Sequence, residues 1–291
     1  MKQLYAAKFS RLLAASVFSF LLAGCSIFDK PEPIPSYIQI DSIPLNITNP
    51  LIQGSSSSKI SDAWVYVDGF LVGAFELPCK LPVLSEGSHK VLIIAGVKQN
   101  GLSSLRAQYP FYKGWQENVN LIRGAVTVMQ PVVEYFPGLD FTDTWMEDFD
   151  GTGLTIANGT GTVAQLHVDN LYGPFEGKSG RVQLNADTIE YVGVSTSFYT
   201  LNASENNWLE LNYKCNESFV VGLMCQGQPF GACEVLAQEQ WNKIYINLQE
   251  AIAEASQVMG SNTFQVYIAM HRTSSTVDQP TLFIDNIKLL K

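Results

Sequence analysis

Alternation of hydrophobic and polar positions dominates the chain from residue 37 onward. It is clearest at 208–213 (WLELNY) and 264–268 (FQVYI), where every second side chain is apolar. A period of two predicts strands with one buried face. Residues 248–258 alone have helical spacing, as a short connection. The pattern therefore predicts an all-β fold.

In the first half, Asp68-Gly69 stands between the apolar runs 64–67 and 70–73. An Asp-Gly pair between two such runs predicts a β-hairpin. Leu77-Pro78 and Leu81-Pro82 are expected to break the chain. Further strands are expected at 91–94, 118–122 and 127–135. Since Phe136-Pro137-Gly138 is typical of a boundary, residues 37–138 are predicted to form one β-domain.

The second half repeats short apolar runs separated by turn residues. Strands are predicted at 163–168, 181–184, 191–198, 208–213, 219–224, 243–248, 264–270 and 282–289. That many strands in so short a segment favour two packed sheets, so residues 143–291 are predicted to form a β-sandwich.

The amino terminus has the pattern of a targeting segment. Residues 1–24 contain three basic and no acidic residues, and the uncharged run 12–24 has only 13 residues. A membrane-spanning helix needs about 20 residues, so the run suits a signal peptide instead. Residues 25–36 follow with three prolines, which favour an extended spacer.

Leu22-Ala23-Gly24-Cys25 resembles the bacterial lipobox, in which the cysteine is lipidated and becomes the first residue of the mature protein. This resemblance implies a membrane anchor of acyl chains on Cys25. Ser26 favours the outer membrane, and the face of that membrane stays open. Asp41-Ser42-Ile43 and Asp187-Thr188-Ile189 resemble the O-glycosylation acceptor of exported Bacteroidetes proteins.

Charge narrows the class of partner. The formal net charge is −9, and removal of the basic segment 1–24 makes it −12. Nucleic-acid binding depends on clustered Lys and Arg, so no nucleic-acid partner is expected. The same charge opposes lying flat on an anionic membrane.

Two family resemblances extend the fold prediction. Val67-Asp68-Gly69 and Gly87-Ser88-His89-Lys90-Val91 resemble the PEGA-type module, a small immunoglobulin-like β-domain of bacterial envelope proteins. Residues 147–151 (EDFDG), 241–248 and 282–288 resemble jelly-roll domains that include carbohydrate-binding modules. The predicted fold is thus an immunoglobulin-like β-sandwich followed by a jelly-roll β-sandwich.

The jelly-roll resemblance implies a structural calcium between the first and last strands. The matching residues are Asp150 and Asp285, and because calcium takes six to eight oxygens, Glu147 or Asp148 would have to contribute. The alternative is that Asp285 caps a turn or pairs with a lysine.

Other candidate residues lie in loops. Tyr172 and Phe175 could stack on a sugar, because apolar sugar faces pack on aromatic rings, and Trp208 is a weaker candidate. The exported setting permits disulfides, and Cys225 and Cys233 flank a glycine-rich turn. Cys215 is a competing partner, and free buried thiols are the other alternative.

No catalytic motif is present. The three histidines are scattered, and no nucleophile elbow, zinc-protease motif or phosphate-binding loop occurs. The sequence therefore predicts a non-catalytic, membrane-anchored lipoprotein that binds a glycan or an envelope protein. The alternatives are an accessory subunit of an outer-membrane assembly and, less favoured, a glycan-active hydrolase.

Overall fold

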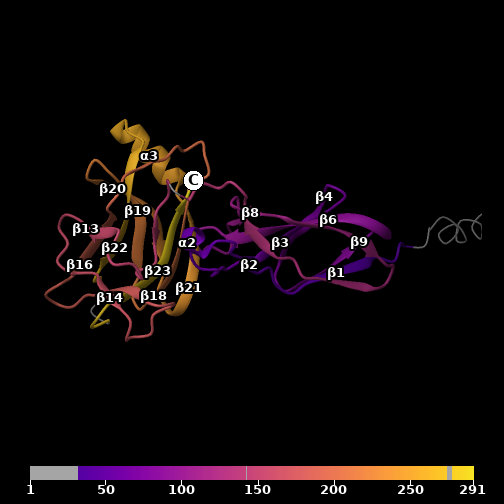
Figure 1. Ribbon diagram of the computed structural model, residues 1–291, viewed down its shortest axis with the longest axis horizontal. Coiled ribbons are helices and arrows are strands. Elements are labelled where there is room, and N and C mark those ends of the chain that lie inside the picture. Colours follow the sequence, from indigo (N-terminus) through magenta and orange to yellow (C-terminus); the bar gives the residue numbers. More distant parts are fainter. Residues whose placement is uncertain (1–31, 142, 274–276) are drawn as a thin grey trace, which may run out of the picture.

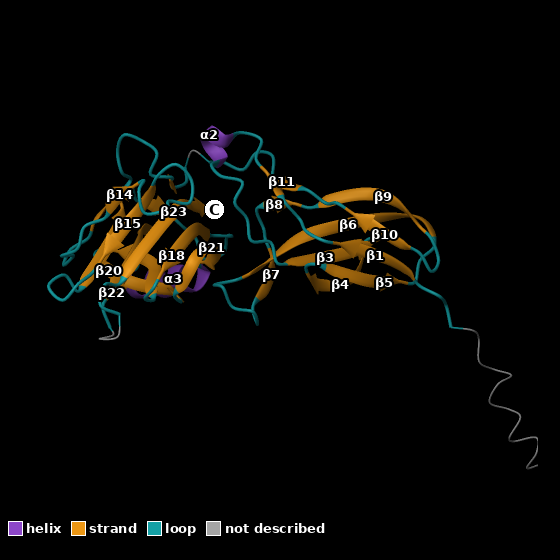
Figure 2. Ribbon diagram, turned by 90° about the horizontal axis from the view of Figure 1, so that it is seen from below, coloured by secondary structure: helices purple, strands orange, loops and turns teal. Residues whose placement is uncertain are grey.

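The computed structural model describes residues 32–141, 143–273 and 277–291. Within these residues the chain is built of strands, with two short helices, and the prediction of an all-β fold of β-sandwiches is confirmed. Figures 1 and 2 show two sandwiches joined end to end, an N-terminal one and a C-terminal one.

The N-terminal sandwich has two main sheets. A five-stranded sheet, β4-β3-β6-β7 with β9 paired to β6, packs against the three-stranded sheet β10-β1-β5. A small sheet, β2-β11-β8, lies toward the C-terminal sandwich (Figure 1). The elements are β1 (Ser36–Ile40), β2 (Leu45–Asn46), α2 (Pro50–Gln53), β3 (Asp62–Val67), β4 (Phe70–Glu76), β5 (Cys79–Val83), β6 (Gly87–Lys98), β7 (Arg106–Gln108), β8 (Tyr112–Lys113), β9 (Trp115–Leu121), β10 (Val126–Met129) and β11 (Val133–Tyr135).

Turn residues explain where these strands meet. Asp68 and Gly69 have φ angles of 51° and 85°, and Val67 pairs with Phe70, so they form the expected two-residue hairpin turn. Leu81-Pro82 does not break the chain as predicted, because both residues lie in β5. Since β5 is an edge strand, the missing N–H of Pro82 is tolerated there.

The C-terminal sandwich consists of two sheets, β14-β15-β23-β18-β21 with β12 against β23, and β13-β16-β22-β19-β20 with β17 against β22. The elements are β12 (Met146–Glu147), β13 (Ile156–Asn158), β14 (His167–Asp169), β15 (Ser179–Gln183), β16 (Glu190–Ser195), β17 (Tyr199–Thr200), β18 (Trp208–Cys215), β19 (Phe219–Cys225), β20 (Gln228–Val235), β21 (Gln238–Asn247), α3 (Gln249–Met259), β22 (Thr263–His271) and β23 (Thr281–Leu290). The predicted helix at 248–258 corresponds to α3.

The predicted Cys225–Cys233 disulfide is wrong. The glycine-rich segment is a tight turn at Gln226-Gly227 followed by β20, and the four cysteines of the described chain are free. Cys225 pairs with Gln228, whereas Cys233 pairs with Val221. At roughly 3.3 Å per residue, four residues of strand separate the two thiols by about 13 Å. A disulfide needs Cα atoms within about 7 Å of each other.

The two hydrophobic cores meet at the joint between the sandwiches. One core fills the space between the two sheets of the C-terminal sandwich. The core of the N-terminal sandwich also includes Trp208, Tyr245 and Leu290, which come from strands of the C-terminal sandwich. The sandwiches therefore share buried surface.

We predict that Gly222→Ala destabilises the C-terminal sandwich. A Cβ atom at Gly222 would collide with the Phe230 carbonyl oxygen and lie 2.7 Å from the Tyr267 ring. Overpacking of this kind costs about 1–3 kcal/mol. Chemical denaturation measures the change in the free energy of unfolding. Gly153→Ala is the matched control because nothing lies within 4 Å of its Cβ position, and equal stability of the two variants would contradict the prediction.

Candidate functional site

One face of the sheet β14-β15-β23-β18-β21 carries a buried carboxylate and a series of cationic and aromatic side chains. Along β18, Leu209, Leu211 and Tyr213 point into the core of the C-terminal sandwich. The alternate residues, Trp208, Glu210, Asn212 and Lys214, therefore belong to the outer face. This outer face is the candidate functional surface.

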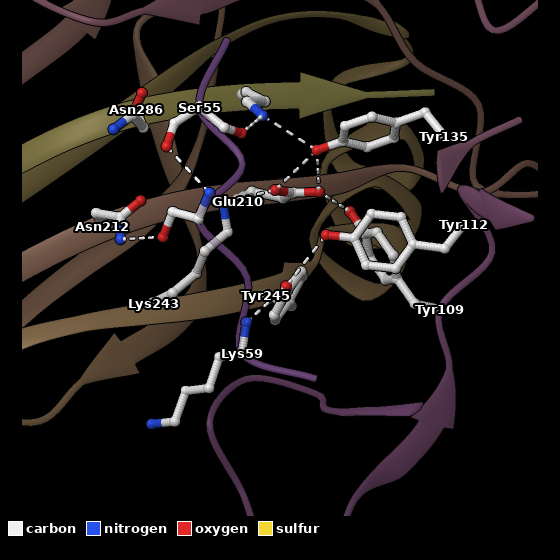
Figure 3. A network of polar contacts seen from close by, with 12 residues as sticks. Ser55, Lys59, Tyr109, Tyr112, Tyr135, Glu210, Asn212, Lys243, Tyr245 and Asn286 are labelled. Atoms are coloured by element: carbon white, nitrogen blue, oxygen red, sulfur yellow. Dashed lines mark hydrogen bonds and ion pairs between the residues drawn. The ribbon is translucent and has the colours of Figure 1, made fainter. Parts of the chain in front are cut away.

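Residues 54–61, here called the strap, cross that outer face (Figure 3). The Lys288 ammonium donates to the Ser55 carbonyl at 3.2 Å, and the Asn212 amide donates to the Ser57 hydroxyl at 2.8 Å. The Lys59 N–H donates to the Tyr245 hydroxyl at 3.0 Å. The strap thus divides the outer face into two halves. The N-terminal sandwich covers one half, and the other half lies outside the joint.

The covered half contains a buried carboxylate. Glu210 is fully buried, and its Oε2 lies 2.7 Å from the Lys243 ammonium. From the N-terminal sandwich, the Tyr109 hydroxyl donates to Glu210 Oε1 at 2.6 Å, and the Tyr135 hydroxyl lies 3.2 and 3.3 Å from the two carboxylate oxygens. Figure 3 shows these groups converging on Glu210 from both sandwiches.

Lys288 completes this network. Its ammonium donates to the Tyr135 hydroxyl at 3.1 Å. Burial, and then the charge of Lys243, lower the pKa of Lys288 to about 7. Burial acts to raise the pKa of Glu210, but the charges of Lys243 and Lys288 and the hydrogen bonds from Lys243 and Tyr109 outweigh it, so that this pKa is lowered. Because both oxygens of this buried carboxylate contact hydroxyl groups of the other sandwich, Glu210 holds the two sandwiches together.

The outer half carries alternating cations and aromatic rings, here called the cation–aromatic row: Arg181, Phe283, Lys214 and Trp241. Arg181 pairs with Phe283 across β15 and β23, and Phe283 pairs with Lys214 across β23 and β18. The Lys214 ammonium lies 4.3 Å from the Phe283 ring centroid and 5.5 Å from that of Trp241. These are cation–π distances.

The loop between β14 and β15 brings the two predicted aromatic residues to this row. The Arg181 guanidinium stacks 4.4 Å from the Tyr172 ring centroid, and the Phe175 ring lies edge-on to Trp241 at 5.4 Å. Trp241 donates its indole N–H to the Gly173 carbonyl at 3.0 Å. Tyr172 stays 61% exposed. The two predicted residues thus pack against the row, and their role in binding a sugar stays a prediction.

Buried acidic residues hold the loop in place. Asp169 accepts hydrogen bonds from the backbone N–H groups of Leu171 and Tyr172 at 3.3 and 3.1 Å. Such a short turn around an aspartate fixes the start of the loop. Phe175 donates its N–H to the Ser179 hydroxyl, which donates to Asp285 at 2.9 Å. Asp285 therefore supports the loop from below.

The charges of the row have no counter-ion in the described chain. Among the described residues, no carboxylate lies within ion-pair distance of Arg181 or Lys214. Instead, Arg181 donates to the Gln183 amide oxygen at 2.7 Å, and Lys214 donates to the Gly173 carbonyl at 3.4 Å. The positive charges of Arg181 and Lys214 are thus not neutralised by an ion pair within the described residues.

The residues predicted to hold calcium are only partly brought together. Asp150 and Asp285 line one pocket of about 560 Å³ with Asp148 and Glu176. Glu147 does not line it, because its two oxygens accept hydrogen bonds from Phe149 N–H and from the N–H and hydroxyl of Thr155.

Two further observations bear on that pocket. Burial raises the pKa of Asp285 to about 7. Within residues 32–291, excluding the four undescribed positions, no group of three or more His, Cys, Asp or Glu side chains is arranged to hold a metal ion. The structural calcium stays a prediction.

Other sequence predictions have varied outcomes. Trp208 is 3% exposed and packs edge-on to Tyr109 at 5.4 Å, so its prediction as a sugar-stacking residue is wrong. His89 lies 2.6 Å from Asp68 at the β3–β4 turn, far along the chain from His167 and His271.

Cys25 lies outside the described residues. In the described part of the chain, no helix has the length and apolar character needed to cross a membrane.

Comparisons with known proteins find likeness only among solved structures. No family model matches the chain, and no curated protein matches it. A family 30 carbohydrate-binding module of a cellulosomal cellulase from Clostridium thermocellum is 16% identical, covers 51% of this chain and 91% of its own, and has a TM-score of 0.33.

A family 29 carbohydrate-binding module shows similar values. One solved variant is 8% identical, with 51% and 91% coverage and a TM-score of 0.33. Another, in complex with mannohexaose, is 8% identical, with 50% and 89% coverage and the same TM-score. At this level the likeness assigns neither a ligand nor a site to this chain.

We predict that Glu210→Gln strongly destabilises the protein. The change leaves Lys243 and Lys288 buried without the carboxylate that neutralises them. Removing one partner of a buried ion pair costs about 3–5 kcal/mol. Denaturant titration of the variant measures the loss in the free energy of unfolding. Glu254→Gln on the exposed face of α3 is the matched control, and a Glu210→Gln loss no larger than this control would contradict the role of the network.

A second prediction concerns the pH dependence that Lys288 contributes. Its pKa of about 7 in the folded chain lies below the ordinary value of 10.5, so the unfolded chain binds more protons between these values. Between pH values of about 7 and 10, the free energy of unfolding should therefore rise more with pH in the natural protein than in the Lys288→Met variant. Chemical denaturation at a series of pH values measures this difference, and parallel profiles would contradict the lowered pKa.

Proposed function

We propose that this chain is a non-catalytic lipoprotein, anchored in the outer membrane by Cys25, that binds an acidic glycan on its C-terminal sandwich. The observation that carries the proposal is the cation–aromatic row beneath Tyr172 and Phe175. Together these residues combine the exposed ring of Tyr172 with two cations that lack an acidic partner within ion-pair distance among the described residues.

The chemistry of the row matches a sugar with a carboxylate group. Apolar faces of a sugar ring stack on aromatic side chains such as Tyr172 and Trp241. The Arg181 guanidinium presents a planar pair of donors that fits a carboxylate, and Lys214 adds a point charge. A neutral glycan would leave both cations without a counter-charge. The row therefore favours uronate-containing polymers over neutral ones.

The anchor completes the proposed function. The positive amino terminus, the short apolar run and the cysteine at position 25 support export and lipidation, and Ser26 supports the outer membrane. A tethered protein with a glycan site would hold a polysaccharide chain against the envelope without cleaving it.

Binding of the detergent-solubilised full chain to polygalacturonate, with neutral galactan as the comparison, tests the proposal. We expect binding to polygalacturonate that weakens with added salt, because surface charge interactions are screened. Hydrogen bonds to charged groups contribute about 1.5–3 kcal/mol, so Arg181→Gln should reduce affinity by about tenfold or more.

Matched variants separate the row from other exposed aromatic residues. Tyr172→Ala should weaken binding. Phe198→Ala should not, although Phe198 is 63% exposed, because it lies between β16 and β17 of the facing sheet. Equal binding of the acidic and neutral polymers, or equal loss in both alanine variants, would contradict an acidic-glycan site on this face.

A further inference from the structure

Large apolar side chains stand in solvent at the end of the N-terminal sandwich that lies away from the C-terminal one. Five residues from four separate segments form this apolar tip, with exposed fractions of 62, 78, 51, 72 and 56% respectively: Ile34, Phe70, Leu71, Leu84 and Ile122. Soluble proteins rarely gather exposed apolar groups in this way unless the surface contacts a partner.

Strand register places these segments together. Ser36 pairs with Val83, so the start of β1 and the end of β5 lie side by side, next to Ile34 and Leu84. Gly87 pairs with Leu121, which brings the residues before β6 to the end of β9. Val67 pairs with Val91, four residues into β6, so the β3–β4 turn lies beside this end, set back by about 13 Å along the strand. Figures 1 and 2 show the described chain entering β1 there.

Two of the carboxylates at the apolar tip have a basic partner. Asp68 pairs with His89 at 2.6 Å, and Glu86 pairs with Arg123 at 2.8 Å. Lys90 is exposed beside them, and Glu32 and Glu117 are exposed carboxylates of the same end. The basic groups partly offset the negative charge of this end, which reduces its repulsion from an anionic membrane surface.

The length of the tether limits how far the apolar tip can lie from a lipidated Cys25. Six residues lie between Cys25 and Glu32, the first described residue, and this segment spans at most about 25 Å when fully extended. Because the described chain begins at the apolar tip, this is the end of the molecule that lipidation holds beside the bilayer.

We infer that the apolar tip docks into the interfacial region of the lipid bilayer, so that the protein stands end-on in the membrane. This inference rests on the lipid anchor of the proposed function. Phe70, Leu71, Leu84 and Ile122 insert among the lipid headgroups, and Arg123 and Lys90 face the phosphates. The docking surface is a second membrane contact, separate from the acyl chains.

Photo-crosslinking of the full chain in bacterial envelopes tests this inference. Phe70→p-benzoylphenylalanine places a photoreactive ring in the apolar tip, and we expect ultraviolet light to attach labelled phospholipid to it. Phe198→p-benzoylphenylalanine is the matched control, because Phe198 is an exposed ring on the C-terminal sandwich and should give no phospholipid adduct above background. Fatty-acid labelling of the same samples reports lipidation independently.

The possible results of this experiment distinguish the docked tip from the lipid anchor. An acylated chain with phospholipid adducts at Phe70 and not at Phe198 supports the docked tip. An acylated chain that forms no lipid adduct at Phe70, forms equal adducts at both positions, or forms a protein adduct at Phe70 overturns the docked tip and leaves the anchor intact. A chain without fatty acid overturns the anchor, and this inference with it.

Discussion

A carboxylate buried between two β-sandwiches is the constraint on which the arrangement of this protein depends. Glu210 lies on a strand of one sandwich, and it is neutralised by Lys243 of the same sheet and bonded by Tyr109 and Tyr135 of the other. Unpaired charge in such a place is costly. The relative position of the sandwiches is therefore the one in which these hydroxyls reach the carboxylate.

The strap explains how a single sheet face serves two purposes. Ser55, Ser57 and Lys59 bond to groups on that face, so the strap closes the joint on one side. Beyond it, the same strands continue with Lys214 and Trp241, which face the β14–β15 loop. The joint and the proposed glycan site thus occupy adjacent stretches of the same strands.

Local patterns predicted the all-β fold well, because alternation and Asp68-Gly69 act over a few residues. They failed where long-range contacts decide. Alternation places Glu210 on the face opposite Leu209 and Leu211, and nothing local shows that a second sandwich covers this face. Trp208 is buried for the same reason. The sequence placed Tyr172 and Phe175 in a loop, which the structure has between β14 and β15, but no local pattern predicts that Trp241 and Arg181 pack against them from neighbouring strands. The role of Tyr172 and Phe175 in binding stays a prediction.

The shared joint makes the protein a spacer of fixed length. Swinging the sandwiches apart would expose Trp208, Tyr245 and Leu290 to water, so bending there is unfavourable. The 12-residue strand β6 alone extends about 40 Å at roughly 3.3 Å per residue. The cation–aromatic row is therefore held at a fixed distance from the segment that enters β1. In the proposed tethered protein, a glycan would have to pass at that distance from the anchor to reach the row.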